Sequence, residues 1–405
     1  MSALEGMNVV DLSRVLGGPF CAQILGDHGA RVIKVEGPSG DETRTWGPPF
    51  RDGMASYFAG INRNKSTVCV DLARPEGREV LFQLLDDADV MIENFKTGTL
   101  ERWGMGFTDV LSVRFPRLVH CRITGYGDSG PLGGVAGYDA AVQALSGLMS
   151  INGTPSDPPT RLGVPVVDVG TGLNACIGIL MALHERSRSG RGQQVETTLY
   201  DCALAGLYPH SINTLFTGRP PQRSGNGHPN IAPYDSYATG TEPLFLAVGN
   251  NGQFARMCEV VKRPDLPADP RFITNATRAV HRFELRTALE NAFRPFAAQD
   301  LFEKLIAVDV PCGVIQNVVE ALAHPHTAHR TMVVEVNGHR SVASPIKMSR
   351  TPASYRSHPQ AIGESTVRVL TEAGLDAETI EKLLAAGIVQ QADAATQSAT
   401  KAAPA

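Results

Sequence analysis

The sequence has no pair of cysteines at the CxxC spacing, and its seven cysteines, an odd number, are scattered over 405 residues. We therefore expect reduced thiols in a cytoplasmic protein, and neither a disulfide framework nor a zinc ribbon. The sequence also has no HExxH motif, and no acid or cysteine follows HPHTAH at ligand spacing. We predict no metal site, and polar loop positions for His324, His326 and His329.

Long apolar runs and an excess of one charge are missing as well. The longest apolar run, ACIGILMAL (175–183), is well short of the roughly 20 residues of a membrane span, so we predict a buried helix there. The N-terminus has no basic segment followed by an apolar one, as a signal peptide would. Because the chain has 37 basic and 41 acidic side chains, no positive electrostatic field that would attract nucleic acid is expected. Small molecules are the predicted partners, with no nucleic acid and no membrane.

What the N-terminal half does contain is an alternation of short β-branched runs with helical patterns. The predicted strands are NVVDL (8–12), RVIKVE (31–36), STVCVDL (66–72), DVMIEN (89–94) and RLVHCRITG (117–125). Helical patterns follow the first and third of these runs. Such alternation is typical of a mostly parallel sheet covered by helices, so we predict an α/β, Rossmann-like large domain. No GxGxxG follows the first strand, and NAD is therefore not expected.

The second half predicts a smaller α/β domain and a return to the first one. A long helix ending near Arg186 and a strand QQVETTL (193–199) precede the Pro/Gly-rich stretch TGRPPQRSGNGHPNIAPY (217–234). Strand-like runs TMVVEV (331–336) and SPIKMS (344–349) and two helices near 364–387 then return to the large domain. The predicted boundaries are 1–200 for the large domain, 201–234 for a linker and site loop, 235–325 for the small domain, 326–390 for the return and 391–405 for a disordered tail.

One acid, Asp168, lies in RLGVPVVDVGTG (161–172), between an apolar strand-like run and a glycine-flanked helix start. An aspartate at this place is a good N-cap for the helix. A carboxylate beside glycines that admit a ligand can also attack an activated acyl group as a nucleophile. Both roles are compatible, and the residues alone do not choose between them.

A set of motifs, in order along the chain, resembles the class III CoA-transferase family, which includes the formyl-CoA and carnitine CoA-transferases. The motifs are VVDLSRVLGGPFCAQILGDHGARVIKVEGPSGDETR, NRNKSTVCVDLARPEG, ADVMIENFKTGTLERWG, ITGYGDSGP, AGYDAAVQALSG and HERSRSGRGQQVETTLYD. The resemblance runs from about residue 3 to residue 388. It implies an interlocked homodimer, an acyl-CoA and a small carboxylic acid as substrates, and no permanently bound cofactor. Several stretches look most like the branch that moves CoA from succinyl-CoA to dicarboxylic acids.

By this resemblance, Asp168 matches the family's nucleophile. It would form a mixed anhydride with the donor acyl group and then an aspartyl-CoA thioester, from which CoA passes to the acceptor acid. The resemblance also implies contacts with CoA or the substrate for a set of matched positions. These are Leu16, Gly17, Val70, Asp71, Leu72, Ala73, Asn94, Phe95, Lys96, Arg102, Tyr138 and Asp139. On physical grounds alone, Arg102 is equally a solvated helix residue.

The sequence departs from its relatives at several places. Formyl-CoA transferases have glutamine at the position of Leu16 and arginine at that of Gly37, so formyl and oxalyl specificity is not expected. Their tetraglycine loop is replaced by SGNGHPN (224–230), which is either a site-covering loop or a plain linker. The related α-methylacyl-CoA racemases use a histidine where AGYD has Tyr138, and a tyrosine is a poor proton shuttle at neutral pH.

Two alternatives to the transferase therefore stay open: a racemase-like isomerase and a non-catalytic acyl-CoA-binding protein.

Three further cations, Arg44, Arg63 and Lys65, stand on predicted loops. They could bind CoA phosphates or a distal carboxylate of the acid, or they could simply be solvated.

Overall fold

The computed structural model describes residues 2–393, which form two compact units. Within the described residues, the first unit contains 2–146, 163–206 and 325–393, and the second contains 147–162 and 207–324. These bounds differ from the prediction in that 147–162 leave the large domain and 207–234 join the small unit, where they include a helix. The predicted tail lies outside the described residues from 394 onward.

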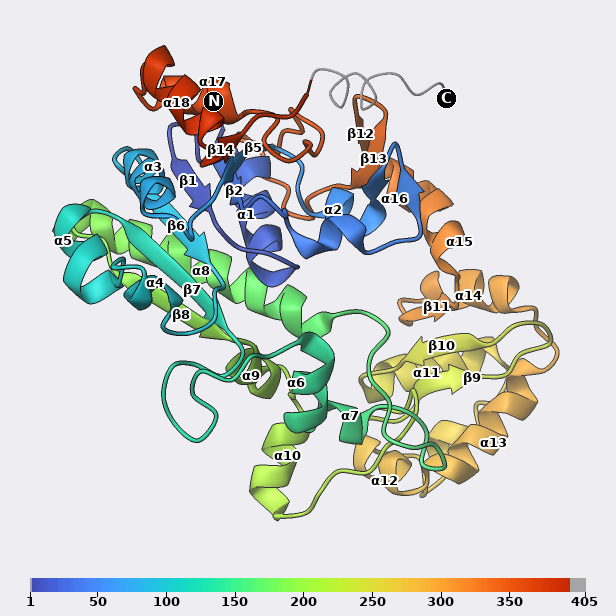
Figure 1. Ribbon diagram of the computed structural model, residues 1–405. Helices are drawn as coiled ribbons and strands as arrows, with labels where there is room; N and C mark the ends of the chain where they lie inside the picture. Colours follow the sequence, from blue (N-terminus) through green and yellow to red (C-terminus); the bar gives the residue numbers. More distant parts are fainter. Residues whose placement is uncertain (1, 394–405) are drawn as a thin grey trace. The chain divides into compact units, whose positions relative to one another are not determined.

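The first unit is built on a seven-stranded sheet with the order β14-β5-β2-β1-β6-β7-β8 (Figure 1). Its strands are β1 (Asn8–Asp11), β2 (Arg31–Glu36), β5 (Lys65–Val70), β6 (Val90–Glu93), β7 (Val119–Thr124), β8 (Gln194–Thr198) and β14 (Val389–Gln390). All neighbours pair in parallel except β14, which is antiparallel to β5. Without β14 this is the doubly wound 3-2-1-4-5-6 order, and the predicted mostly parallel sheet is confirmed.

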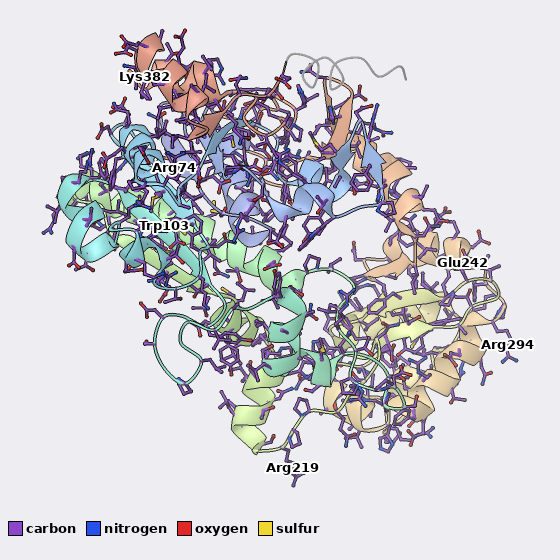
Figure 2. All side chains as sticks on the ribbon, in the orientation of Figure 1. Arg74, Trp103, Arg219, Glu242, Arg294 and Lys382 are labelled. Carbon is purple, nitrogen blue, oxygen red and sulfur yellow. The ribbon has the colours of Figure 1, made fainter. Side chains whose placement is uncertain are left out.

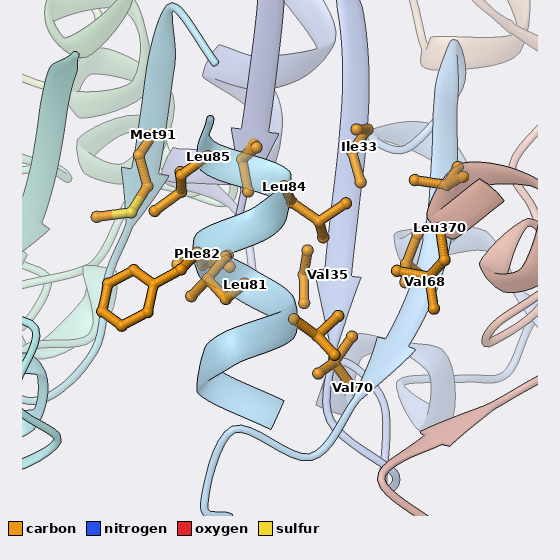
Figure 3. Packing of buried hydrophobic residues seen from close by; sticks show 14 of the residues in the cluster. Ile33, Val35, Val68, Val70, Leu81, Phe82, Leu84, Leu85, Met91 and Leu370 are labelled. Atoms are coloured by element: carbon orange, nitrogen blue, oxygen red, sulfur yellow. The ribbon is translucent and has the colours of Figure 1, made fainter. Parts of the chain in front are cut away.

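One face of this sheet packs against α3 (Pro75–Leu85), which begins with a proline in its first turn. Apolar side chains at helical spacing, such as Leu81 and Leu84, contact alternate residues of the strands, including Ile33, Val35 and Val68 (Figure 3). Because side chains alternate between the two faces of a strand, the residues between them point to the opposite face.

That opposite face holds charged side chains that are fully buried. The Lys65 ammonium lies 2.9 Å from the Asp11 carboxylate, and the Lys34 ammonium lies 3.1 Å from Asp41. Each lysine also donates to a main-chain carbonyl near the start of α1 (Gly17–Asp27): Lys65 to Pro19 at 2.8 Å and Lys34 to Ser13 at 2.9 Å. The ion pairs thus fasten the connection between β1 and α1 to the sheet.

The long helix α8 (Val166–Ser189) connects β7 to β8 and packs against α1. A Cβ on Gly172 would lie 2.5 Å from the carbonyl oxygen of Gly17, so the two helices meet backbone to backbone. Among the described residues, α8 alone is long and apolar enough to cross a membrane by length and composition. The prediction that its apolar run is buried is wrong for one face, where Ile177 and Met181 are 50% and 66% exposed.

Shorter elements complete the first unit. They are η1 (Glu42–Thr45), β3 (Phe50–Arg51), β4 (Met54–Ala55), α2 (Ser56–Gly60), α4 (Thr99–Arg102), η2 (Phe107–Leu111), α5 (Ser112–Arg114), α6 (Asp139–Leu145), α9 (Leu199–Ala205), α16 (Pro325–His329), β12 (Val333–Val336), β13 (His339–Val342), α17 (Thr366–Glu372) and α18 (Ala377–Ala385). The strand β12 pairs with β13 in a hairpin. The predicted strand SPIKMS (344–349), which comes after this hairpin, has no regular structure. His326 and His329 lie on α16 instead of the predicted loop.

The second unit has its own core around a three-stranded antiparallel sheet of order β11-β10-β9. Its strands are β9 (Tyr234–Tyr237), β10 (Leu244–Ala247) and β11 (Cys312–Val314). Its helices are α7 (Leu148–Ile151), α10 (His210–Thr217), α11 (Asn251–Val260), η3 (Leu266–Ala268), α12 (Asn275–Val280), α13 (Arg282–Phe293), α14 (Ala298–Ile306) and α15 (Val318–Ala323). Phe254, Leu289 and Leu301 are fully buried between helices and sheet, so the predicted smaller α/β lobe has an independent core.

Candidate active site

A pocket of about 210 Å³ lies in the first unit at the carboxyl ends of the parallel strands. Its walls are the segments that leave β1 (14–17), β6 (94–97) and β7 (123–125), a glycine-rich loop (134–138), and the residues Glu42, Asp168 and Leu199. In a sheet of this order the strands are added outward from β1 in one direction (β2, β5) and then in the other (β6, β7, β8), so the order reverses between β1 and β6. The pocket therefore lies at the switch point where open α/β sheets bind ligands.

The wall that follows β1 is held in one conformation by hydrogen bonds. The Asp11 side chain accepts from the main-chain N–H and the hydroxyl of Ser13. The peptide of Arg14 is clamped by Asn94, which accepts from the Arg14 N–H at 2.9 Å and donates to its carbonyl at 2.7 Å. Val15 then takes the left-handed conformation with a φ of 69°. A β-branched residue at positive φ is strained, and the hydrogen bonds on either side maintain it at the pocket.

The opposite wall is formed where glycine residues let two chain segments touch. A Cβ on Gly125, just after β7, would lie 2.5 Å from the main-chain nitrogen of Gly137. Among the described residues, no hydrogen-bond acceptor is found for the main-chain N–H groups of Ala136 and Gly137, which line the pocket. These groups can donate to an oxygen of a bound ligand.

Asp168 lies in the first turn of α8, three residues after the N-cap, Pro165. The predicted strand-like run before it is wrong, since the helix already begins at Val166. The predicted N-cap role is also wrong, because a different carboxylate has it. Asp139, at the start of α6, accepts from the main-chain N–H groups of Val167 at 2.8 Å and Asp168 at 3.1 Å. The side chain of Asp168 is left free to line the pocket.

Electrostatics make Asp168 unusual among the carboxylates of the chain. Burial, and then the negative charge of Asp139, raise the pKa of Asp168 to about 7. The same charges reach Tyr57 on α2: burial, followed by the charges of Asp168 and Asp139, raises the pKa of its hydroxyl to about 12. A carboxylate with a pKa near neutrality is more basic than an ordinary aspartate, and perturbed pKa values of this kind cluster at functional sites.

The acid limb of the pH profile is expected to report this shift. For a reaction that requires the ionised Asp168 carboxylate, kcat/KM should fall about tenfold per pH unit below a pKa near 7. Asp139→Asn removes the like charge but keeps an acceptor for the helix N–H groups, so the limb should move to lower pH. Steady-state rates from pH 5 to 9 measure both. A limb near pH 4 in the unchanged protein, or one that rises in the variant, would contradict this account.

The structure brings together seven of the residues assigned from the resemblance. Lining the pocket are Leu16, Gly17, Asn94, Phe95, Lys96, Tyr138 and Asp168. Asp139 stands behind Asp168 as described above. The rings of Phe95 and Trp103, the latter labelled in Figure 2, pack in a T-shaped arrangement with 5.4 Å between their centroids.

The remaining assigned residues lie outside the pocket. Val70 is the last residue of β5, and Asp71, Leu72 and Ala73 follow it. They lie at the same edge of the sheet as the pocket but two strands away from β1. Arg102, at the end of α4, is exposed and donates to the Thr99 hydroxyl at 2.9 Å. Loop 224–230 belongs to the second unit.

Three predicted loop cations are internal ion-pair partners. Arg44 forms two hydrogen bonds to the Glu36 carboxylate, at 2.6 and 2.8 Å, and Arg63 pairs with Asp27 at 2.6 Å. Lys65 is the first residue of β5 and pairs with Asp11. The prediction of solvated or ligand-binding cations is therefore wrong here, because buried acids that lie 8, 36 and 54 residues away in the sequence neutralise Arg44, Arg63 and Lys65.

Sequence reasoning missed Arg14, Val15, Glu42 and the glycine loop 134–137. The available signal was positional: residues that follow parallel strands meet at one edge of the sheet.

Comparison with known proteins places this site in a family. A family model described as CoA-transferase family III matches residues 4–366. The chain belongs to this family. Family III CoA-transferases are transferases that use CoA thioesters as substrates, and the predicted enzyme class is confirmed.

Several characterised relatives cover nearly the whole transferase. The succinate–glutarate CoA-transferase of Agrobacterium fabrum is 40% identical over 94% of this chain and 96% of its own. The human succinyl-CoA:glutarate CoA-transferase is 36% identical over 96% of this chain and 90% of its own. The crystal structure of a CAIB/BAIF family protein from Brucella suis has a TM-score of 0.82 and 38% identity, covering 92% of this chain and 99% of that one.

Proposed function

We propose that this transferase moves CoA from a dicarboxylic acyl-CoA such as succinyl-CoA to another small dicarboxylic acid, with Asp168 as the covalent nucleophile. The observation that carries the proposal is the position of Asp168: a partly buried carboxylate with a pKa near 7, in a pocket at the switch point of the sheet. The dicarboxylic substrates are supported by the names of the relatives from Agrobacterium fabrum and human.

The reaction consists of four displacements at carbonyl carbons, two for the donor and two for the acceptor. An oxygen of Asp168 attacks the donor thioester, the C–S bond breaks, and a mixed anhydride and CoA thiolate result. The thiolate attacks the aspartyl carbonyl, which releases the donor acid and leaves an aspartyl-CoA thioester. The acceptor carboxylate attacks this thioester to form a second anhydride and thiolate. The thiolate then attacks the acceptor's acyl carbon, and the new acyl-CoA leaves with Asp168 restored.

Two features of the pocket suit these steps. Each tetrahedral intermediate carries an oxyanion, and the unpaired N–H groups of Ala136 and Gly137 are donors for it. Gly17 begins α1, so its N–H is a further donor without an intrahelical partner. The anhydride and the aspartyl-CoA thioester both hydrolyse readily. Apolar residues in the pocket wall, such as Leu16 and Leu199, limit the access of water to them.

The rest of CoA would extend along the carboxyl edge of the sheet. Residues 70–73 lie at the end of β5 on this edge. The segment 94–97 follows β6, and Arg102 comes a few residues later in the chain. Since CoA carries a pyrophosphate and a further phosphate, cations at this edge favour its binding. The match of these positions to the family's CoA contacts supports the same placement.

We also propose a homodimer. Leu173, Ile177 and Met181 stand four residues apart on α8 and are 43%, 50% and 66% exposed, which makes an apolar stripe on one face of the helix. Exposed apolar surface of this kind marks an interface. The resemblance to an interlocked family favours a second copy of the chain as the occupant. The mass in solution should be twice that of the chain, and a stable active monomer would contradict the dimer.

Three assays distinguish the transferase from its alternatives. With succinyl-CoA and glutarate, the protein should form glutaryl-CoA and succinate in equal amounts, with no net thioester hydrolysis. An isomerase would instead exchange an α-proton of a 2-methylacyl-CoA with deuterated water. A non-catalytic binding protein would do neither. Proton exchange without transfer, or binding without either reaction, would overturn the proposed function.

A further inference from the structure

The pocket is lined by two cationic side chains, both on exposed residues, that no described residue neutralises. Arg14 and Lys96 both line it, and among residues 2–393 neither side chain has a hydrogen bond or an ion pair. Other cations near the sheet are different, since Arg44 and Lys65 each pair with an internal carboxylate. An unpaired cation at the wall of a substrate pocket is available to an anionic group of a ligand.

Arg14 differs from Lys96 in how its backbone is held. The reciprocal hydrogen bonds to Asn94 fix the Arg14 peptide, and the left-handed Val15 follows directly. The guanidinium therefore extends from a fixed point on the same wall that carries Leu16 and Gly17. The main chain of Lys96 has no comparable clamp from a side chain among the described residues. Because the main chain of Arg14 is already fixed, less conformational entropy is lost when its side chain binds a ligand.

We propose that Arg14 binds the distal carboxylate of the dicarboxylic acyl group and thereby selects dicarboxylic over monocarboxylic substrates; this inference rests on the proposed function. One carboxyl of the substrate reacts at Asp168, and the other remains ionised inside the pocket. Arg14 is exposed to solvent, and a carboxylate bound beside it exchanges part of its hydration for the charge of the guanidinium. The planar guanidinium offers two parallel N–H donors that match a carboxylate, which a lysine ammonium cannot do.

The negative charges at the pocket are consistent with this role. Glu42 and Asp168 line the same pocket, and neither forms an ion pair with Arg14 among the described residues. The cation thus offsets like-charge repulsion between these acids and an incoming dicarboxylate. A phosphate of CoA is the other anion that Arg14 could bind, and the experiment must separate the two sources.

Succinyl-CoA and butyryl-CoA form a matched pair, because a methyl group of the second replaces the distal carboxylate of the first while the CoA part is unchanged. The variants are Arg14→Gln and Arg14→Lys. Arg188→Gln is the control, since Arg188 is exposed at the end of α8 and does not line the pocket. The measurement is kcat/KM for each donor with acetate as a common acceptor, together with the inhibition constant of free CoA.

The Arg14→Gln variant should lose about 10- to 150-fold in kcat/KM for succinyl-CoA, as expected for a lost charge-assisted hydrogen bond, and less than about threefold for butyryl-CoA. Arg14→Lys should fall between the two, and the inhibition constant of CoA should not change. An equal loss for both donors, or weaker inhibition by CoA, would assign Arg14 to a phosphate and overturn the inference. If the Arg14 variants lose activity equally with both donors while the reaction still depends on Asp168, only this inference is refuted. If transfer is absent, or does not depend on Asp168, the proposed function is refuted.

Discussion

Replacement of Asp168 by asparagine is expected to lower kcat for CoA transfer by at least about 10⁴-fold, as found when a covalent nucleophile is removed. The amide oxygen cannot form the anhydride or the thioester, although the side chain fills the same space in the first turn of α8. CoA binding should be nearly unchanged, because the pocket walls at 14–17 and 94–97 do not depend on this side chain. Transfer rates and CoA affinity measure the two effects separately.

Asp86→Asn is the matched control, since Asp86 is an exposed carboxylate at the end of α3. It should retain full activity.

The Asp168→Asn variant should also be more stable than the unchanged protein at pH 8. The folded pKa of about 7 lies above that of an unfolded aspartate, about 3.9, so the ionised carboxylate costs stability above pH 7 and the cost vanishes below pH 4. Substantial residual transfer would refute the nucleophile.

Replacement of Lys65 by methionine is expected to reduce the free energy of unfolding by about 3–5 kcal/mol. The substitution leaves the Asp11 carboxylate, fully buried under α1, without the ammonium that neutralises it at 2.9 Å. It also removes the donor to the Pro19 carbonyl and so releases the β1–α1 connection that forms one pocket wall. Thermal or urea unfolding measures the loss, and activity should fall with it at temperatures near the transition.

The comparison for this variant is Arg31→Met, which breaks an ion pair with Glu372 whose two side chains are 43% and 41% exposed. Exposed pairs contribute little, so its cost should be below about 1 kcal/mol. Replacing Asp11 and Lys65 together by apolar residues should recover part of the loss, because no unpaired charge then remains. Equal costs for the buried and exposed pairs would contradict the structural role of the buried cluster.

The elements of the sheet could be predicted because each of its central strands carries the signal locally. Runs such as RVIKVE place β-branched residues next to one another, so that both faces of the strand carry an apolar side chain, as is typical of strands covered by helices. The strand order could not be obtained this way, since pairing of β1 with both β2 and β6 depends on contacts between distant segments. The family resemblance, and not the local pattern, pointed to Asp168 as the proposed nucleophile.

The site was less accessible to prediction for the same reason. Asp168 looked like an N-cap because the chain places it at a helix start, but the cap comes from Asp139, 29 residues earlier. Arg63 and Lys65 looked solvated because their partners, Asp27 and Asp11, lie 36 and 54 residues away. Arg14 carried no signal of its own, and only the folded chain shows that it lines the same pocket as Asp168.

Chemical trapping of the enzyme tests the covalent role of Asp168 most directly. Hydroxylamine added during turnover with succinyl-CoA converts an activated aspartyl carbonyl to a hydroxamate, which mass analysis of the peptide around residues 161–186 locates. The account predicts a hydroxamate on Asp168 that forms only when acyl-CoA is present. Continued transfer with no modification there, or modification of a different side chain, would contradict it.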